Sequence, residues 1–210
     1  MGEFDERILD EIIRPWESLS AAMAEQYAIE PNDPQTIRSA IALAASIRQT
    51  AVHAGLELQE ICLSSPEFAL VSAVADSPKP SVFASASKKG LLSVTAHFET
   101  DGQGNYAFIR NVIGITDQGS GRRDFLEVAS AAAQYLIGCL NLKIESTFQI
   151  KVASLDFGNE VVLFQGPNAP AAGTSVNIQI LKRGPGDELA PFSPPSWRLN
   201  LKPNPNADTV

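Results

Sequence analysis

The run of residues best suited to chemistry is the segment 119–123, which reads Gly119, Ser120, Gly121, Arg122 and Arg123. It lies after a predicted strand and before a predicted helix. Backbone N–H groups at a helix start favour an anion, glycine permits close approach, and guanidinium groups form charge-assisted bonds with phosphate. The run lacks the further positions of a P-loop or a dinucleotide fingerprint. It indicates either an anion site in a phosphate- or nucleotide-binding enzyme, or a turn in which Ser120 or Asp124 caps the helix.

Other patterns for catalysis or metal binding are weak. Only His53 and His97 could serve as an imidazole base, and no Gly-x-Ser-x-Gly elbow is present. Cys62 and Cys139 fall on predicted helices among apolar neighbours, so we expect buried free thiols. We predict no catalytic residue, no metal site and no cofactor, and the patterns lean against an enzyme.

A predicted β-hairpin and helix position the segment 119–123. In residues 92–99 an apolar set alternates with a polar set that includes Thr95 and Glu99, as in a half-buried strand. Residues 101–105 are all turn formers or glutamine, and the return strand at 106–116 is apolar on both faces, which suggests the middle of a sheet. A helix from residue 125 to about 140 is expected to lie across that sheet.

The N-terminal region predicts a helical hairpin. One helix is expected over residues 4–28 with a kink or break at Pro15, and a second from Pro34 towards Leu63 with a weak point at Gly55. Residues 1–30 carry eight acidic and two basic side chains, so most of the net charge of -8 lies there. This acidity predicts either a solvated helix face or a docking surface for a basic partner.

Five further strands are predicted, at residues 68–75, 81–87, 148–152, 161–164 and 176–180. Short turns between strands favour antiparallel pairing. The predicted fold class is α+β: a mainly antiparallel sheet of about six to seven strands with a central docked helix, the N-terminal hairpin and an extended tail. The predicted segments are 1–63 for the hairpin, 64–183 for the sheet body, which is expected to form one domain with the hairpin, and 184–210 for the tail.

The composition of the chain limits the kinds of binding partner and the cellular compartment that we expect. An acidic chain cannot neutralise phosphates in the way a general nucleic-acid binder does, so no nucleic acid is expected. No apolar run approaches the length of a membrane span, and no membrane partner is expected. The absence of a disulfide framework and of an apolar leader predicts a cytoplasmic protein.

The tail at 184–210 differs from the rest, because it holds six prolines yet keeps apolar anchors. Such a composition is extended or disordered in isolation. The anchors predict either a strap on its own domain or docking on a neighbouring subunit or partner, through Phe192, Trp197, Leu199 and Leu201. The leading hypothesis is a non-enzymatic protein-binding or assembly protein, such as an adaptor, a chaperone or a structural subunit. It would engage another protein or copies of itself through the tail and the acidic helices.

Overall fold

A computed structural model of the 210-residue chain describes residues 3–76, 92–117, 121–144, 148–166 and 175–204. The chain forms two compact units, each assembled from separate stretches. Unit 1 comprises Met1–Ser20, Pro34–Ser93 and Ile113–Ile150, and unit 2 comprises Ala21–Asp33, Val94–Val112 and Lys151–Val210. These units divide the chain at other points than the three segments predicted from the sequence.

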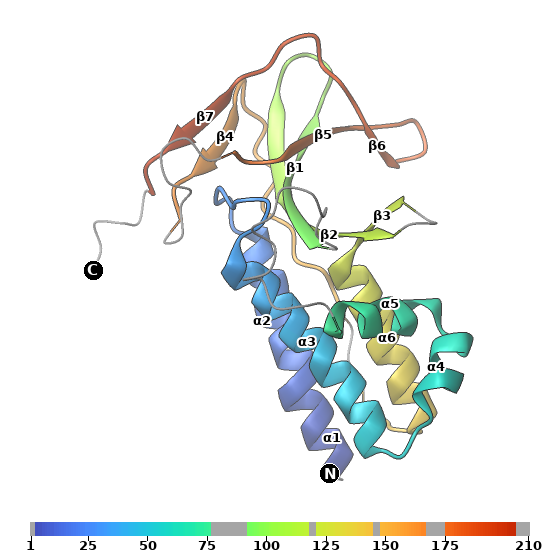
Figure 1. Cartoon of the computed structure of the whole chain (residues 1–210). Helices are drawn as coiled ribbons and strands as arrows, with labels where there is room; N and C mark the ends of the chain where they lie inside the picture. The colour runs from blue at the N-terminus through green and yellow to red at the C-terminus, as the bar shows by residue number, and fades with distance from the viewer. Residues whose placement is uncertain (1–2, 77–91, 118–120, 145–147, 167–174, 205–210) are drawn as a thin grey trace. The chain divides into compact units, whose positions relative to one another are not determined.

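Unit 1 is built mainly from helices (Figure 1). In chain order they are α1 (Glu3–Ile8), the π-helical turn η1 (Leu9–Ile13), α2 (Arg14–Ala24), whose last turn belongs to unit 2, α3 (Pro34–His53), α4 (Leu58–Ser64), α5 (Pro66–Ala75) and α6 (Phe125–Cys139). α3 packs against η1, α5 and α6. None of the described helices combines the length and the apolar character that crossing a membrane requires.

The N-terminal helix accommodates Pro15 through the π-helical turn. Proline has no N–H, and its ring clashes with the carbonyl one turn earlier in an α-helix. Just before it, the N–H of Arg14 bonds to the carbonyl of Leu9, one residue further back than in an α-helix. The wider turn lets the helix continue as α2, so the predicted disturbance at Pro15 takes the form of a π-helical turn.

The second predicted helix ends ten residues before Leu63. α3 stops at His53, and Gly55 follows with a φ of 73°, in the left-handed region that favours glycine. The N–H of Leu56 then bonds to the carbonyl of Ala51 at 3.1 Å, which closes the helix end. The prediction of one helix to Leu63 is therefore wrong, because the glycine ends α3 and the chain restarts as α4.

Residues 68–75, predicted as a strand, belong to helix α5. The hydroxyl of Ser65 accepts a hydrogen bond from the N–H of Phe68 at 3.1 Å, and Pro66 occupies the first turn. A short apolar run fits a buried strand and a buried helix equally, so its periodicity could not separate them. The cap and the proline decide for the helix. The strand predicted at 81–87 lies outside the described residues.

Helix α6 packs against other helices, α5 and α3 above all, and not across the sheet as predicted. Its buried face includes Phe125, Val128, Ala132 and Leu136, which recur in the sequence at helical spacing. Cys139, which continues the same spacing, is exposed. This periodicity indicates a buried face, but it does not say which surface covers it. Here the other side of the contact is provided by α3 and α5.

Trp16 anchors the N-terminal helix to α6 inside unit 1. Only 1% of Trp16 is exposed, and its indole N–H donates a hydrogen bond to the carbonyl of Leu126 at 3.0 Å. The ring of Phe148 meets it edge-on, with centroids 5.1 Å apart and an interplanar angle of 82°. Apolar burial, a hydrogen bond and an aromatic contact therefore all depend on this one side chain.

The strands form two sheets instead of the single sheet of six to seven strands that was predicted. β1 (Leu92–Thr100), β2 (Tyr106–Asp117), β3 (Gly121–Asp124), β5 (Ile178–Arg183) and β6 (Leu189–Pro191) pair in the order β3-β2-β1-β5-β6. β4 (Val161–Phe164) and β7 (Leu199–Lys202) form a parallel pair. The larger sheet is mainly antiparallel, with one parallel pairing between β1 and β5. The coarse class, α+β with a mainly antiparallel sheet, is confirmed.

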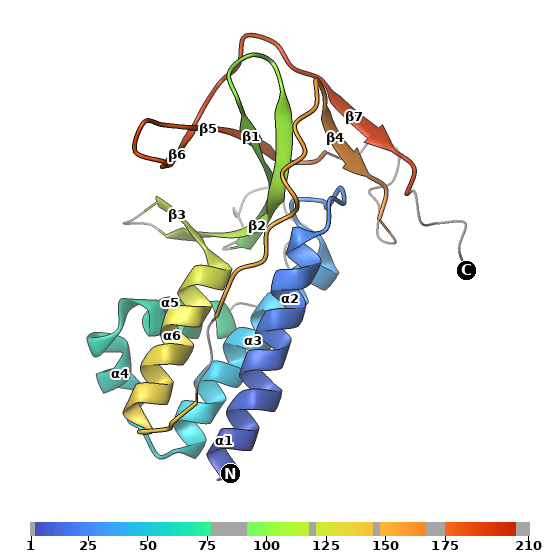
Figure 2. The same ribbon diagram turned by 180° about the vertical axis from the view of Figure 1, so that it is seen from behind.

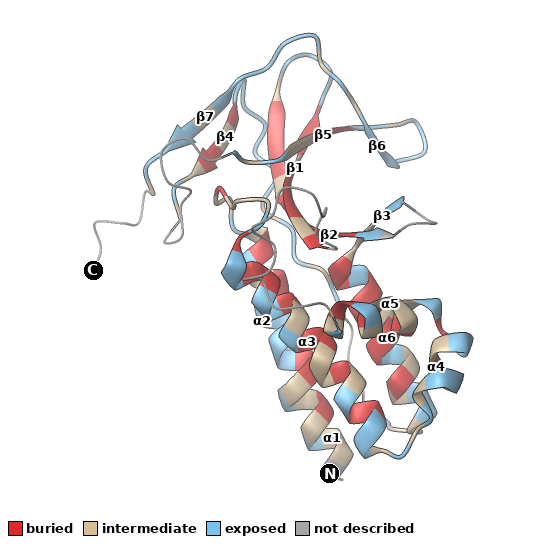
Figure 3. Cartoon of the chain, in the orientation of Figure 1, coloured by how far each residue is buried: buried red, intermediate tan, exposed pale blue. Residues whose placement is uncertain are grey.

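β1 is buried on both faces, and not half-exposed as its alternation predicted (Figure 3). Thr95 is only 3% exposed and Glu99 only 6%. β2 and β5 occupy the two edges of β1, and Arg183 of β5 bonds to the Glu99 carboxylate. The hydroxyl of Thr95 is buried without a hydrogen-bond partner among the described residues. Alternation in a sequence therefore does not by itself show that the polar face of a strand is exposed.

Three further predictions concern residues 148–152, the strands after them and the tail. Residues 148–152 are in no strand, contrary to the prediction, while β4 and β5 appear where strands were expected. The tail, which was expected to be extended, contributes β6 and β7 to the two sheets. The tail therefore lies on its own unit, and hydrogen bonds to β5 and β4 hold it there. This agrees with the strap hypothesis and leaves the partner hypothesis open.

Replacement of Trp16 tests the anchor of unit 1. Trp16→Ala should lower the free energy of unfolding by about 3–5 kcal/mol, because it removes a large buried side chain. Trp16→Phe should cost less, since it keeps most of the apolar contact and loses the hydrogen bond to Leu126. Urea denaturation followed by circular dichroism measures both. Equal losses of unfolding free energy for the two variants would show that the apolar contacts of the buried ring are not what stabilises unit 1.

Candidate functional site

The segment 119–123, the predicted anion site, is described only in part. Gly119 and Ser120 lie outside the described residues, while Gly121 opens strand β3 with a φ of 83°. β3 runs antiparallel to the end of β2 and leads directly into α6. The carboxylate of Asp124 accepts a hydrogen bond from the N–H of Leu126 at 2.9 Å, so the alternative prediction of an Asp124 cap is confirmed.

Both arginines of this segment have partners within unit 1. The guanidinium of Arg122 donates to the carbonyl of Ser93 at 3.0 Å, and burial lowers its pKa. It crosses Gly114, where a Cβ would stand only 1.9 Å from its Nε, so glycine makes room for the side chain. Arg123 forms an ion pair with Glu67 at 2.9 Å. Anion binding at the segment remains a prediction. Its two guanidinium groups already bond to Ser93 and Glu67.

The remaining reactive side chains do not gather into a catalytic group. His97 is partly buried on β1, and His53 is exposed at the end of α3. Cys62 is partly buried and Cys139 is exposed, so the expectation of two buried thiols is wrong for Cys139. Among the described residues, no three His, Cys, Asp or Glu side chains are placed to hold a metal ion.

A groove of about 320 Å³ lies between β5 and the tail in unit 2. Six of its eight lining residues are apolar in type, and no side chain in it is titratable: Ile178, Gln179, Ile180, Pro191, Phe192, Ser193, Pro194 and Trp197. The tail is fastened there by a hydrogen bond of 2.8 Å from the N–H of Phe192 to the carbonyl of Ile180. The sequence had singled out Phe192 and Trp197, but the groove also needs the facing side chains of β5.

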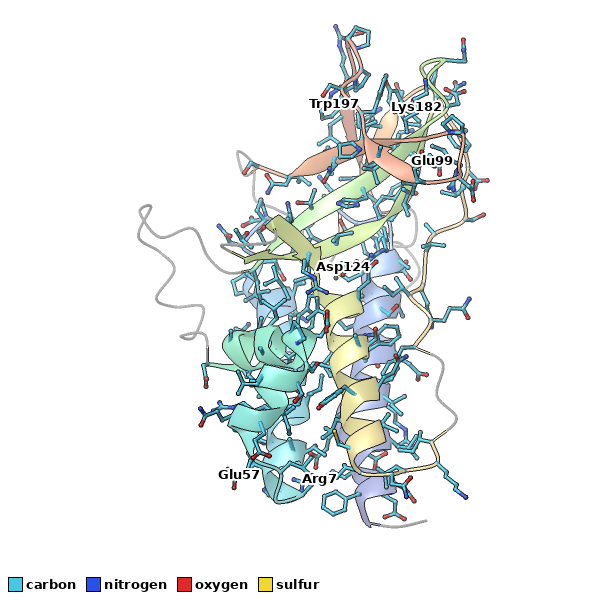
Figure 4. All side chains as sticks on the ribbon, turned by 90° about the vertical axis from the view of Figure 1, so that its right-hand side faces the viewer. Arg7, Glu57, Glu99, Asp124, Lys182 and Trp197 are labelled. Carbon is cyan, nitrogen blue, oxygen red and sulfur yellow. The ribbon has the colours of Figure 1, made fainter. Side chains whose placement is uncertain are left out.

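The two aromatic side chains of the groove, Phe192 and Trp197, differ in exposure. Figure 4 labels Trp197 and Lys182 in unit 2. Phe192 packs partly buried on the core of unit 2, and the ammonium of Lys182 stands 5.3 Å from its ring centroid. Trp197 is 41% exposed. Phe192 therefore holds the tail in place, while Trp197 presents an aromatic surface to the solvent.

The other two predicted contact residues, Leu199 and Leu201, lie on β7. Each is 38% exposed. They pair with Val161 and Leu163 of β4, which are fully buried. Phe192, Trp197, Leu199 and Leu201 are therefore all on unit 2, and three of them are exposed apolar side chains. We call these four residues the tail surface.

An ion pair between buried Glu99 and partly exposed Arg183 supports the strand that lines the groove. Arg183, at the end of β5, donates from Nε and Nη2 to the two carboxylate oxygens of Glu99, both at 2.8 Å. A second contact joins Arg183 to Asp187 at 3.0 Å in the turn before β6. The hydrogen bonds to Glu99 raise the pKa of Arg183, and those to Asp187 raise it to a smaller extent. The pair fixes β1, β5 and the β5–β6 turn to one another, and the sequence offered no signal for it beyond an acidic residue in a strand.

The ion pair between Glu67 and Arg123 predicts a pH dependence for unit 1. The hydrogen bond from Arg123 lowers the pKa of Glu67 below the usual value of a glutamate. A lowered folded-state pKa stabilises the fold above the unfolded pKa, and this contribution disappears as the pH falls through the folded value. Glu67→Gln should therefore lose about 1 kcal/mol or less at pH 7, and this difference from the wild type should shrink as the pH falls through the folded-state pKa of Glu67.

Urea denaturation of the wild type and Glu67→Gln between pH 3 and pH 7 measures this difference. Glu60→Gln is the matched control, because Glu60 is exposed on α4 and no ion pair is described for it. A gap between wild type and Glu67→Gln that persists unchanged at pH 3 would show that the ion pair is not its cause.

No protein-family model, no curated protein and no solved structure matches the chain. Its function must therefore be argued from the side chains themselves, and the tail surface of unit 2 offers the most.

Proposed function

We propose that the chain is a non-enzymatic protein-binding or assembly protein whose tail surface engages another protein or further copies of itself. The observation that carries this proposal is Trp197, which lines the groove and is 41% exposed. Tryptophan is enriched among the residues that dominate binding energies at protein interfaces. Its ring combines a large apolar area with an N–H donor, so a partner gains contact and a hydrogen bond together.

The tail surface has the composition of an interface core. Its exposed members are apolar or aromatic, and Leu189, 38% exposed on β6, adds a further apolar side chain in unit 2. Single exposed apolar residues are ordinary, but several on one short segment favour a binding role. The groove and β7 are built on hydrogen-bonded strands, so a partner would meet a surface that needs little ordering.

The groove favours binding over catalysis. General acid–base chemistry requires a titratable group within reach of the substrate, and the groove lining contains none. Its only polar side chains are Gln179 and Ser193, which can orient a bound backbone through hydrogen bonds. A phosphate- or nucleotide-binding enzyme at residues 119–123 gains no support, because Arg122 and Arg123 are bonded to Ser93 and Glu67.

The acidic N-terminal helices form a second, weaker part of the proposal. Arg7 pairs with Glu11 and Arg14 pairs with Asp10, both one turn apart, so these four charges cancel locally. Glu6 and Glu17 are exposed and add to the net negative charge of this face. Such a surface would assist the approach of a basic partner, and its effect should fall with salt.

Replacing Trp197 tests the proposal. Native mass spectrometry of the full-length protein from its own source should find a complex of defined mass. Trp197→Ala should weaken that complex about tenfold or more, because it removes a central aromatic contact. Leu63→Ala is the matched control, since Leu63 is an exposed apolar residue on α4 of unit 1, 80% accessible. Its complex should be unchanged.

Two results would contradict the proposal. One is a monomer at every concentration examined, with no associated mass. The other is a complex that survives Trp197→Ala as well as it survives Leu63→Ala. Circular dichroism of each variant should match the wild type, which separates lost contact from lost fold.

A further inference from the structure

Strand β7 has one side that no described strand occupies (Figure 2). It pairs in parallel with β4 alone, and the N–H of Gln165 bonds to the carbonyl of Lys202 at 2.8 Å. In a parallel ladder alternate residues bond to the same neighbour. Asn200 and Lys202 therefore turn their backbone groups towards β4. Those of Leu199 and Leu201 point the other way, as an open edge.

The leucine side chains on this edge strand are only partly covered. Paired residues in a sheet share a face, so Leu199 and Leu201 lie on the same face as Val161 and Leu163, which belong to the core. The two residues on β4 are fully buried, yet the leucines on β7 remain 38% exposed. Within the described chain the leucines lack a neighbour because the sheet ends at β7. One more strand with apolar residues on this face would cover them.

The opposite face of β7 is basic. Arg198 precedes the strand and Lys202 ends it, with Asn200 between them on the same face. Glu160 contacts Lys202 at 3.9 Å and accepts a hydrogen bond from Asn200 at 3.0 Å, while no ion pair of Arg198 is described. The two cations and the single carboxylate leave a net positive charge on this face. Natural sheets usually protect open edges with proline, bulges or charges that point inwards, and residues 199–202 contain no proline.

We propose that β7 accepts an extended segment of another protein as an added strand, in which apolar residues alternate with acidic ones. The apolar residues would continue the face of Leu199 and Leu201, and the acidic residues would lie beside Arg198 and Lys202. The backbone groups of the two leucines would pair with the incoming strand. The inference rests on the proposed function, and it specifies the mode of contact and the chemistry of the partner.

A second copy of β7 fits this edge poorly. An antiparallel pair that uses the open groups of both leucines sets Leu199 opposite Leu201 of the other copy. The same register sets Arg198 opposite Lys202, and like charges directly across a sheet are destabilising. An acidic partner strand replaces that repulsion with attraction.

Palindromic peptides test the inference, because they present the same residues in parallel and antiparallel pairing. The probe is a blocked peptide with the core Glu-Val-Ser-Val-Glu, and its charge-reversed control is Lys-Val-Ser-Val-Lys. NMR titration of the full chain should show that the acidic peptide binds about tenfold more tightly, since two cross-strand charge pairs change sign. The double variant Arg198→Glu/Lys202→Glu should reverse the order. Lys143→Glu, an exposed change in unit 1, should preserve it.

Amide hydrogen exchange separates strand addition from contact by side chains alone. The amides of Leu199 and Leu201 should exchange rapidly in the free protein and slow about tenfold or more when the peptide is bound, because open-edge groups become paired. The amides of Asn200 and Lys202 should be protected in both states. Equal binding of the two peptides, or no binding, overturns the inference, and so does binding without protection of the leucine amides. If a Trp197-dependent complex persists in those cases, the proposed function survives; if it is absent too, both fail.

Discussion

The burial of β1 on both faces is the constraint on which the rest of unit 2 depends. A central strand that carries Glu99 away from water must satisfy its carboxylate. Arg183 meets this need with two hydrogen bonds of 2.8 Å. Because Arg183 ends β5 and also contacts Asp187, the same side chain fixes the turn that leads into the tail. The strand that lines the groove beside Trp197 is therefore held by an ion pair between the ends of β1 and β5.

The tail gains its structure from pairing, because its composition alone cannot supply a core. β6 bonds to β5 and β7 bonds to β4, and the prolines among the described tail residues fall at a strand end or outside the strands. This arrangement holds the backbone while leaving Trp197, Leu199 and Leu201 partly in water. A segment that is fastened by its backbone and exposed through its apolar side chains is well prepared for a partner, since little entropy remains to be lost on binding.

The basic side chains of the described chain occupy two kinds of position. Arg122, Arg123 and Arg183 are all bonded to groups of the chain itself, at Ser93, Glu67 and Glu99. Arg198 and Lys202 flank the open side of β7 instead. The cations that resemble a phosphate site in the sequence are thus structural in the described part of the chain. Arg198 and Lys202 lie in the tail, whose composition is typical of a linker.

The sequence by itself determined the elements with strong local signals: the N-terminal helices, the stripe of α6, the hairpin at residues 101–105 and the apolar anchors of the tail. Caps decided the ambiguous run at 68–75, where Ser65 and Pro66 select a helix that periodicity could not distinguish from a strand. Only the tertiary structure decided that α6 packs on helices, that Glu99 is buried, and that β5 lies beside β1. These outcomes depend on contacts between residues far apart in the chain, and the pattern within one segment carries no information about which distant surface will cover it.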